Sequence, residues 1–185
     1  MRRIVYSVAM SLDGYIAGPK GEADWIVMDP DLGSAFERFF QRFDTLLIGR
    51  KTFQAMGGKT TGGPPGFPKF AVAICSSTLK PADYPDVTVI GRDLAAEIAA
   101  LKSAPGRDIW LFGGGELFRS LLDLGLVDSL SVGVIPVLLG GGIPLLPVPA
   151  QRASLKLTGH KVYPKTGTLS LEYAIEPPKR RARKR

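Results

Sequence analysis

The segment IWLFGGGEL, residues 109–117, has the composition of a phosphate-binding turn. Four apolar residues typical of a strand end in Gly113, Gly114 and Gly115, and a helix-like sequence follows. Because glycine has no Cβ, the backbone there can take positive φ and an anion can approach the main chain, where the first N–H groups of the helix point at it. The segment therefore favours a nucleotide cofactor. The alternative is that the glycines serve only the close packing of the strand on the helix.

A second element of the same kind lies at residues 48–53, with the sequence IGRKTF. A strand is expected to end at Gly49, and a helix to begin with Arg50, Lys51 and Thr52. An anion at this helix start would meet free N–H groups, a hydroxyl group and two cations. The alternative is that Thr52 caps the helix and that both cations are simply exposed.

Further polar residues follow two other expected strands. Ser76 and Ser77 come at the end of the third strand, and Arg92 comes at the end of the fourth. In open α/β sheets, ligands bind at the carboxyl ends of the strands, so these residues are expected on the same edge as Arg50 and the glycine turn. Together they could hold a ribose 2′-phosphate, which favours NADP over NAD. Taken singly, each is an ordinary turn residue.

The elements that must position these residues alternate between strand-type and helix-type patterns, which predicts an α/β sheet covered by helices. Strands are expected at residues 3–11, 45–49, 70–75, 87–90, 109–112 and 129–136, and helices at 32–42, 51–56, 93–103 and 116–124. Residues 155–162 and 168–175, separated by a short Pro/Gly-containing turn, resemble an antiparallel hairpin. The sequence thus predicts a mostly parallel mixed sheet with an antiparallel edge.

Two segments are too rich in glycine and proline for regular structure. Residues 57–68 are expected to form a surface loop. Residues 136–149, PVLLGGGIPLLPVP, are also apolar, so they need cover from the protein itself, from a ligand or from a second subunit. The sequence has no internal repeat and no linker, and we expect one domain over residues 1–176.

Composition excludes several classes of protein. At 185 residues and 45% hydrophobic, the chain has enough material for one core, and no apolar run approaches the about 20 residues that cross a bilayer. The amino-terminal residues resemble a first strand more than a signal peptide, so a cytoplasmic protein is expected. Cys75 is the single cysteine and His160 the single histidine, which leaves no intramolecular disulfide, no cluster of soft ligands for a metal and no zinc deaminase signature.

The formal net charge of +7 is concentrated at the end of the chain. KRRARKR, residues 179–185, accounts for six of these seven charges, so the rest of the chain is nearly neutral. Residues 177–185 are therefore expected to be a flexible basic tail. Such a tail attracts RNA or another anionic partner independently of sequence, and the simpler alternative is a solubilising terminus. Nucleic-acid binding is not expected elsewhere.

The motifs in order resemble the dihydrofolate reductase superfamily over residues 3–176. They are SLDGYIAG at 11–18, IGRKTF at 48–53, CSST at 75–78 and IWLFGGGELF at 109–118. Within that superfamily, LVDSLSVGVIPVLLGGGIPLLP at 126–147 is similar to the reductase domain, which is the carboxyl-terminal one, of the riboflavin-biosynthesis deaminase-reductase. The resemblance implies a dihydrofolate-reductase-like three-layer fold. It also implies a homodimer, for which the apolar residues 135–147 are the expected contact.

The resemblance further implies an NADPH site. The residues it assigns are Gly49, Arg50, Lys51 and Thr52 at the phosphates, Ser76, Ser77 and Arg92 near the 2′-phosphate, Gly113, Gly114, Gly115, Glu116 and Leu117 along the diphosphate and the nicotinamide ribose, and Ala9 and Ile16 against the nicotinamide ring. Glu116 is unusual at an anion site, because its carboxylate would repel a diphosphate unless it points to solvent or to a ribose hydroxyl.

The expected substrate side departs from the folate reductases, which place an acidic residue at the start of the helix after the first turn. Asp29 and Asp31 are the candidates here, but Asp31 is displaced by two residues and Asp29 matches less well, and either could instead be the helix N-cap. With them, Trp25 and Phe36 are expected to line the substrate side, the alternative for both being a core position.

These residues lead to three hypotheses. The first is an NADPH-dependent reductase of a small heterocyclic substrate, similar to 5-amino-6-(5-phosphoribosylamino)uracil reductase, in which the protein positions the reactants and the cofactor carries the hydride. The second is a dihydrofolate or pterin reductase. The third is a non-catalytic nucleotide-binding or RNA-binding module that retains the fold.

Overall fold

The computed structural model describes residues 1–58 and 68–176, apart from the side chains of residues 32–36. The predicted basic tail at 177–185 and most of the predicted loop at 57–68 therefore lie outside the described residues. None of the helices in the described part of the chain has the length and apolar character that crossing a bilayer requires.

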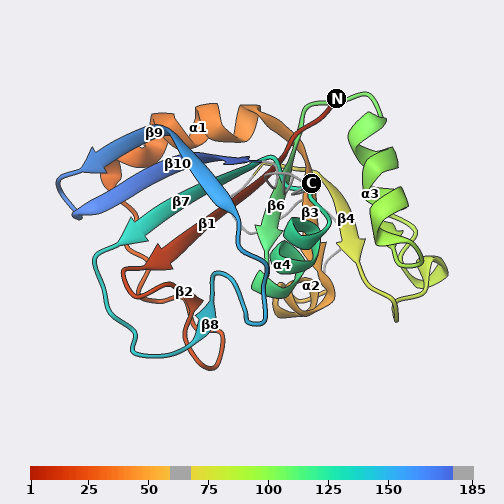
Figure 1. Ribbon diagram of the computed structural model, residues 1–185, viewed down its shortest axis with the longest axis horizontal. Helices are drawn as coiled ribbons and strands as arrows, with labels where there is room; N and C mark the ends of the chain where they lie inside the picture. Colours follow the sequence, from red (N-terminus) through yellow and green to blue (C-terminus); the bar gives the residue numbers. More distant parts are fainter. Residues whose placement is uncertain (59–67, 177–185) are drawn as a thin grey trace, which may run out of the picture.

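Eight strands form one mixed sheet in the order β5-β4-β3-β6-β1-β7-β10-β9 (Figure 1). The first six strands of this order are mutually parallel, β10 runs antiparallel to β7, and β9 runs antiparallel to β10. This confirms the predicted sheet with its antiparallel pair at the end of the chain. The strands are β1 (Ile4–Ser11), β3 (Phe43–Gly49), β4 (Ala71–Cys75), β5 (Thr88–Ile90), β6 (Asp108–Gly113), β7 (Ser129–Ile135), β9 (Ser154–Tyr163) and β10 (Thr168–Glu176).

Helices cover both faces of the sheet and complete three layers. Helices α1 (Gly33–Gln41) and α2 (Arg50–Ala55) pack on one face, around an aromatic core that includes Phe53 and Trp110. Helices α3 (Leu94–Ser103) and α4 (Gly115–Asp123) pack on the other face. Short 3-10 turns, η1 (Pro30–Leu32) and η2 (Pro81–Asp83), precede α1 and β5. The predicted helices thus all form, within two residues of their expected ends.

Alternate residues of β1 and β7 face opposite sides of the sheet, and the two sides carry side chains of different size. Toward α3 and α4, both strands present large apolar side chains that belong to the core. Toward α1, the same strands present small side chains between the larger Val5 and Ile135, which leave the space above them unfilled. The large residues are Ile4, Tyr6, Val8, Met10, Leu130, Val132 and Val134, and the small ones are Ser7, Ala9, Ser131 and Gly133.

A small second sheet departs from the sequence-based expectation. Strand β2 (Tyr15–Ala17) pairs with β8 (Ile143–Pro144), inside the segment 136–149 that was expected to lack regular structure. Leu145 and Leu146 of this segment pack against the core. The protein itself therefore covers part of this apolar segment. Strands of two and three residues, paired across more than a hundred residues of chain, leave no periodic pattern in the sequence.

Asp13 holds this second sheet in place. Its carboxylate accepts hydrogen bonds from the backbone N–H of Leu139 at 3.1 Å and of Gly140 at 2.7 Å, and from the Ser11 hydroxyl at 2.6 Å. The Ser11 hydroxyl is the largest influence on the pKa of Asp13, and with the two backbone donors it lowers that pKa below its ordinary value. The turn after β1 is thereby tied to residues 139 and 140.

A buried hydroxyl in the core gives a testable stability prediction. The Tyr6 hydroxyl has no hydrogen-bond partner among the described residues, and burial raises its pKa. The Tyr6 ring stacks on Phe118 at 4.2 Å, a contact that phenylalanine would keep. Because an unsatisfied buried hydroxyl is costly, we expect Tyr6→Phe to raise the free energy of unfolding by about 1 kcal/mol. Urea denaturation measures this change.

The matched control is Tyr84→Phe. The Tyr84 ring packs edge-on against Phe53, and its hydroxyl is not a buried unpaired group. We expect that substitution to change the free energy of unfolding by less than about 0.5 kcal/mol. If Tyr6→Phe lowered the stability instead, the Tyr6 hydroxyl would have a favourable partner in solution, and the prediction would be wrong.

Candidate active site

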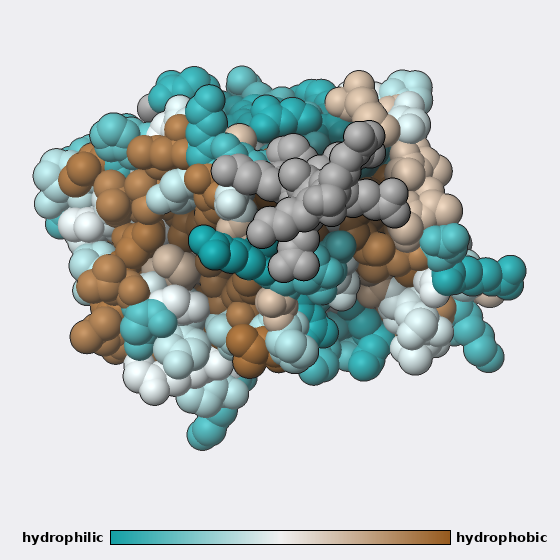
Figure 2. Space-filling view, in the orientation of Figure 1, coloured by the Kyte–Doolittle hydropathy of each residue, from teal (hydrophilic) through white to brown (hydrophobic). Residues whose placement is uncertain are grey.

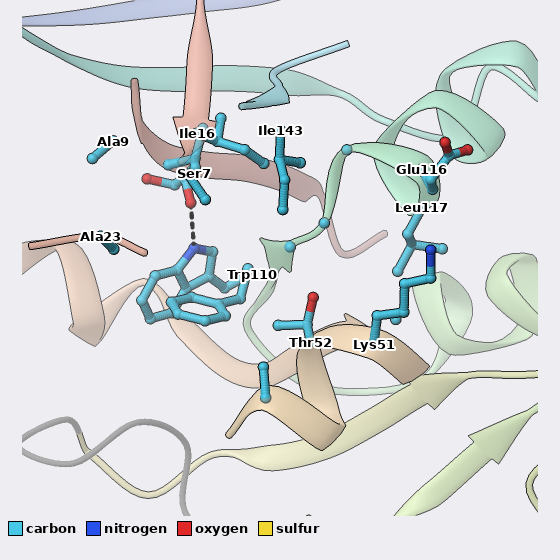
Figure 3. A pocket seen from close by; sticks show the side chains of 18 of the residues that line it. Ser7, Ala9, Ile16, Ala23, Lys51, Thr52, Trp110, Glu116, Leu117 and Ile143 are labelled. Carbon is cyan, nitrogen blue, oxygen red and sulfur yellow. Dashed lines mark hydrogen bonds between the residues drawn. The ribbon is translucent and has the colours of Figure 1, made fainter. Parts of the chain in front are cut away.

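A cavity of about 1210 Å³ runs along the carboxyl ends of the parallel strands and onto the α1 face of the sheet (Figure 3). Pockets that enclose one drug-sized ligand typically measure about 300–1,000 Å³, so this cavity is larger than one such ligand requires. We call its two parts the edge half, formed by the loops after β3, β4, β5 and β6, and the floor half, formed by the α1 face of β1, β7 and β10.

The edge half gathers the polar segments that the sequence analysis singled out. Arg50, Lys51 and Thr52 come from the start of α2, and Ser76 and Ser77 follow β4. The glycine turn between β6 and α4 completes this half. Of the residues predicted to bind a dinucleotide, all except Arg92 line the cavity, namely Ala9, Ile16, Gly49, Arg50, Lys51, Thr52, Ser76, Ser77, Gly113, Gly114, Gly115, Glu116 and Leu117.

The two helices that begin at the edge half have no side-chain cap. Gly49 is the N-cap of α2 and Gly114 is the N-cap of α4, and neither position provides a side-chain hydrogen bond to the helix. The alternative in which Thr52 caps α2 is therefore wrong. Uncapped N–H groups carry the positive end of the helix dipole, which suits an anionic ligand.

Helix α3 differs, because its own carboxylates occupy its start. Asp93 accepts a hydrogen bond from Ala96 N at 3.0 Å, and Glu97 Oε1 accepts from the N–H of Gly91, Arg92 and Asp93 at 3.3, 2.9 and 3.0 Å. These hydrogen bonds, led by that from Asp93, lower the pKa of Glu97. An anion at this point would meet a carboxylate. The side chain of Arg92 is exposed and is not part of the cavity lining.

The glycines of the turn serve two different purposes. A Cβ on Gly115 would lie 2.7 Å from the carbonyl oxygen of Pro144 and 2.9 Å from Pro147 Cδ, so this position is reserved for glycine by close packing. Cβ atoms on Gly113 and Gly114 would each lie 3.5 Å from Thr52 Oγ1, at ordinary contact distance. Gly113 and Gly114 are joined by a cis peptide bond. The packing alternative thus describes Gly115, and the other two glycines face Thr52 across the edge half.

Glu116 does not present an unpaired carboxylate to the edge half. Its Oε2 lies 2.8 Å from Arg119 Nη2, and the side chain is 63% exposed. Figure 3 shows Glu116 at the rim, far from Ser7 and Trp110. Because Arg119 neutralises it at the surface, Glu116 does not prevent a diphosphate from binding at the start of α4.

The floor half is made of small and polar residues in two rows across three strands. Ser7 is in register with Ser131, and Ser131 with Glu172 of β10. One row nearer the edge half, Ala9 is in register with Gly133, and Gly133 with Ser170. The Trp110 indole donates a hydrogen bond to the carbonyl oxygen of Ser7 at 3.2 Å and lies beside this floor (Figure 3).

Apolar residues face the floor half from the other side of the cavity. They come from the segment between β2 and η1 and from α1. Val27 and Met28 are 58% and 54% exposed although they line the cavity, so a bound ligand would cover them. The members of this apolar side are Ala23, Ile26, Val27, Met28 and Phe39.

Asp29 and Asp31 lie outside the cavity lining. Asp29 is 2% exposed and accepts hydrogen bonds from the Thr166 hydroxyl at 3.0 Å, from Thr166 N at 3.2 Å and from Asp31 N at 2.9 Å. Burial raises the pKa of Asp29, but these hydrogen bonds outweigh it, and the net pKa is lowered. Asp31 Oδ1 accepts a hydrogen bond from Lys165 Nζ at 2.8 Å.

Both carboxylates therefore tie η1 to the turn between β9 and β10. By accepting from Asp31 N, Asp29 acts as a cap at the start of η1, in line with the capping alternative. The predicted acid–base role of Asp29 and Asp31 stays a prediction, and their hydrogen bonds do not favour it.

The other two predicted substrate residues are Trp25 and Phe36. Trp25 donates a hydrogen bond to the carbonyl oxygen of Glu22 at 3.2 Å and does not line the cavity. The side chain of Phe36 lies outside the described residues. The sequence analysis missed Ser7, Ser131, Gly133, Ser170 and Glu172. A signal for β1 and β7 was present, because both strands alternate large apolar residues with small ones.

Comparisons with known proteins agree with this architecture. A family model described as the RibD C-terminal domain matches residues 2–169. The uncharacterized protein YyaP of Bacillus subtilis (strain 168) is 35% identical over 181 residues, which cover 93% of this chain and 94% of that protein. The crystal structure of a putative riboflavin biosynthesis protein from Shewanella sp. PV-4 matches with 28% identity and a TM-score of 0.77, over 96% of this chain and all of that one.

The fold also extends to the folate reductases. The dihydrofolate reductase of Enterococcus faecalis, solved in complex with NADP(H), matches with a TM-score of 0.66 over 95% of this chain and 97% of that chain. At 19% sequence identity, this likeness shows the fold alone.

Proposed function

Because this chain belongs to the RibD C-terminal domain family, we propose that it is an NADPH-dependent reductase of a small heterocyclic substrate, similar to 5-amino-6-(5-phosphoribosylamino)uracil reductase. The observation that supports this proposal best is the two-part cavity. Its edge half collects the predicted dinucleotide-binding residues, and its floor half provides a second, adjoining space. A hydride transfer between two bound molecules needs both spaces side by side.

The edge half fits a dinucleotide phosphate in its chemistry. Arg50 and Lys51 supply two cations, and the starts of α2 and α4 supply N–H groups that no side chain caps. Ser76 and Ser77 add hydroxyl groups for a 2′-phosphate. Ala9 and Ile16 are apolar and line the cavity, so they can pack against a nicotinamide ring.

In this proposal the cofactor supplies the hydride when it is bound, and the protein supplies position and shelter. The apolar lining of the floor half, Trp110 and Phe39 among it, would exclude water once a substrate covers Val27 and Met28. The dihydrofolate alternative depended on Asp29 or Asp31, and both carboxylates are held outside the cavity. The proposal therefore does not route a proton through either of them.

A direct test is to follow NADPH binding by fluorescence and NADPH oxidation by absorbance, with ribosylaminouracil, dihydrofolate and pterin substrates. We expect NADPH to bind and one of the substrates to be reduced. Removing the residues after Pro178 should leave NADPH binding unchanged. The third hypothesis, a nucleic-acid-binding module, predicts a different result. The protein would then not bind NADPH, and it would bind a polyanion only while residues 179–185 are present.

We also propose that the protein is a homodimer. Within the predicted contact, Leu138 is 70% and Ile143 is 40% exposed, while Leu145 and Leu146 pack inward against the core. Only part of residues 135–147 is thus available to a second subunit. Figure 2 shows apolar surface on the side of the molecule where β1, β7 and β9 lie. On β9, the large apolar residues Leu155, Leu157 and Val162 are exposed.

A further inference from the structure

The charged side chains that line the main cavity are unevenly distributed. In the part of the chain that the structure describes, they are Arg50, Lys51, Glu116 and Glu172. The first three belong to the edge half, at the starts of α2 and α4. Glu172 belongs to the floor half, on β10. The floor half therefore has a carboxylate and, among its described lining residues, no cation.

The position of Glu172 is fixed by strand register. It closes the row that begins at Ser7 and passes through Ser131, a row about 10 Å long across three strands. On the other side of β10, Gly159 of β9 is its partner, and a Cβ at Gly159 would lie 3.7 Å from Glu172 Oε2. The missing side chain at Gly159 leaves space beside the carboxylate.

Three hydroxyl groups of the floor half are unpaired. Within residues 1–58 and 68–176, the hydroxyls of Ser7, Ser131 and Ser170 make no hydrogen bond to the protein. Each hydroxyl can both donate and accept, and half-buried polar groups of this kind are satisfied by water or by a ligand. They surround the apolar space with groups that can fix the orientation of a flat polar ring.

Arg42 forms only a weak ion pair with Glu172 and does not neutralise its carboxylate. Arg42 Nη1 lies 4.0 Å from Glu172 Oε1, at the limit of an ion pair, and the two side chains are 38% and 50% exposed. Exposed pairs at such distances contribute little. Arg42 does not line the main cavity, but together with Glu172 and Ser131 it lines a second cavity of about 230 Å³.

We propose that Glu172 is the specificity-determining residue of the floor half. The substrate presents paired N–H donors to it and, unlike the substrate of 5-amino-6-(5-phosphoribosylamino)uracil reductase, carries no phosphate group. This inference rests on the proposed reductase function. Two carboxylate oxygens accept two parallel N–H bonds, as an amino-substituted nitrogen heterocycle offers along one edge. A substrate phosphate would meet Glu172 in the floor half, and Arg50 and Lys51 would already be engaged by the dinucleotide in the edge half.

The test uses 2,4-diaminopyrimidine, which presents such an edge, titrated by calorimetry into the full-length protein with and without NADPH. Glu172→Gln keeps the shape of the side chain but removes its charge and one acceptor. We expect it to weaken binding of the probe about 10–100-fold, the loss of one charge-assisted hydrogen bond. Glu176→Gln is the matched control, at the end of the same strand and outside the cavity lining, and should leave probe binding unchanged.

A second arm compares uridine with uridine 5′-phosphate. We expect the phosphorylated compound to bind no more tightly than the nucleoside, and Glu172→Gln to improve its binding relative to the nucleoside. Tighter binding of the phosphate, lost in Arg42→Ala, would overturn the proposal and assign the phosphate to Arg42. The proposal would also be wrong if 2,4-diaminopyrimidine did not bind, or if Glu172→Gln left its binding unchanged.

The two proposals fail in distinguishable ways. A wild-type protein that does not bind NADPH contradicts the reductase function, whatever the probe does. NADPH binding that is retained in the wild type and in Glu172→Gln, together with unchanged probe binding, contradicts the role of Glu172 alone.

Discussion

Gly133→Leu is expected to lower kcat/KM for the reduction by about 100-fold while the protein still folds and binds NADPH. Gly133 lies in the middle of the floor half, between Ala9 and Ser170, and a Cβ built on it meets no atom within 4 Å. A leucine side chain would therefore extend into the cavity without displacing the core. It would occupy the space in which the substrate must lie against the cofactor.

Gly141→Leu is the matched control for this substitution. Gly141 also has open space around it and does not line the cavity. Both variants add the same apolar side chain, so a loss of activity confined to Gly133→Leu would locate the substrate in the floor half. Circular dichroism and NADPH titration check that the fold and the edge half remain intact. Full activity of Gly133→Leu would show that the substrate lies elsewhere.

Arg50→Ala is expected to weaken NADPH binding about 10–100-fold, because a cation that contacts a phosphate contributes a charge-assisted hydrogen bond. Arg50 lines the edge half at the start of α2, and its one hydrogen bond within the described chain is a 3.2 Å contact from Nη1 to Gln54 Oε1. Fluorescence titration measures the dissociation constant, and the loss should shrink at high salt.

Arg92→Ala tests the part of the sequence-based prediction that the structure does not support. The side chain of Arg92 does not line the cavity, and its backbone N–H already donates a hydrogen bond to Glu97. We therefore expect Arg92→Ala to weaken NADPH binding by less than about threefold. Parallel titrations with NADH separate two roles for Arg50. A loss for NADPH alone assigns Arg50 to the 2′-phosphate, and an equal loss for both assigns it to the diphosphate. If Arg50→Ala and Arg92→Ala weakened NADPH binding equally, the dinucleotide would have to contact Arg92 as well, and the placement in the edge half would be wrong.

All the residues predicted to bind a dinucleotide except Arg92 line one cavity, and the reason is local. A strand that ends in glycine and a helix that follows it are contiguous in the chain, and the N–H groups at the helix start belong to the same segment. In residues 48–53 and 109–117, the local sequence therefore determines most of the geometry of the strand end and the helix start. The parallel order of the strands then needs only the rule that carboxyl ends share one edge.

The roles of Asp29 and Asp31 could not be predicted from neighbouring residues alone. Their sequence suits either an acid at the substrate or a cap at a helix start, and the choice depends on a contact with Thr166 and Lys165, more than 130 residues away. Only the packing of the β9–β10 turn against η1 brings these partners together.

The sequence by itself determined the alternation of strands and helices, the mixed sheet, and the glycine turns and helix starts of the edge half, because each depends on neighbouring residues. The tertiary structure alone decided the floor half. Ser7, Ser131 and Glu172 share one row because β1, β7 and β10 pair in one register, and the row stays open because small side chains face α1. A cavity is the space that side chains from several distant segments leave unfilled, so the sequence of any one segment does not predict it.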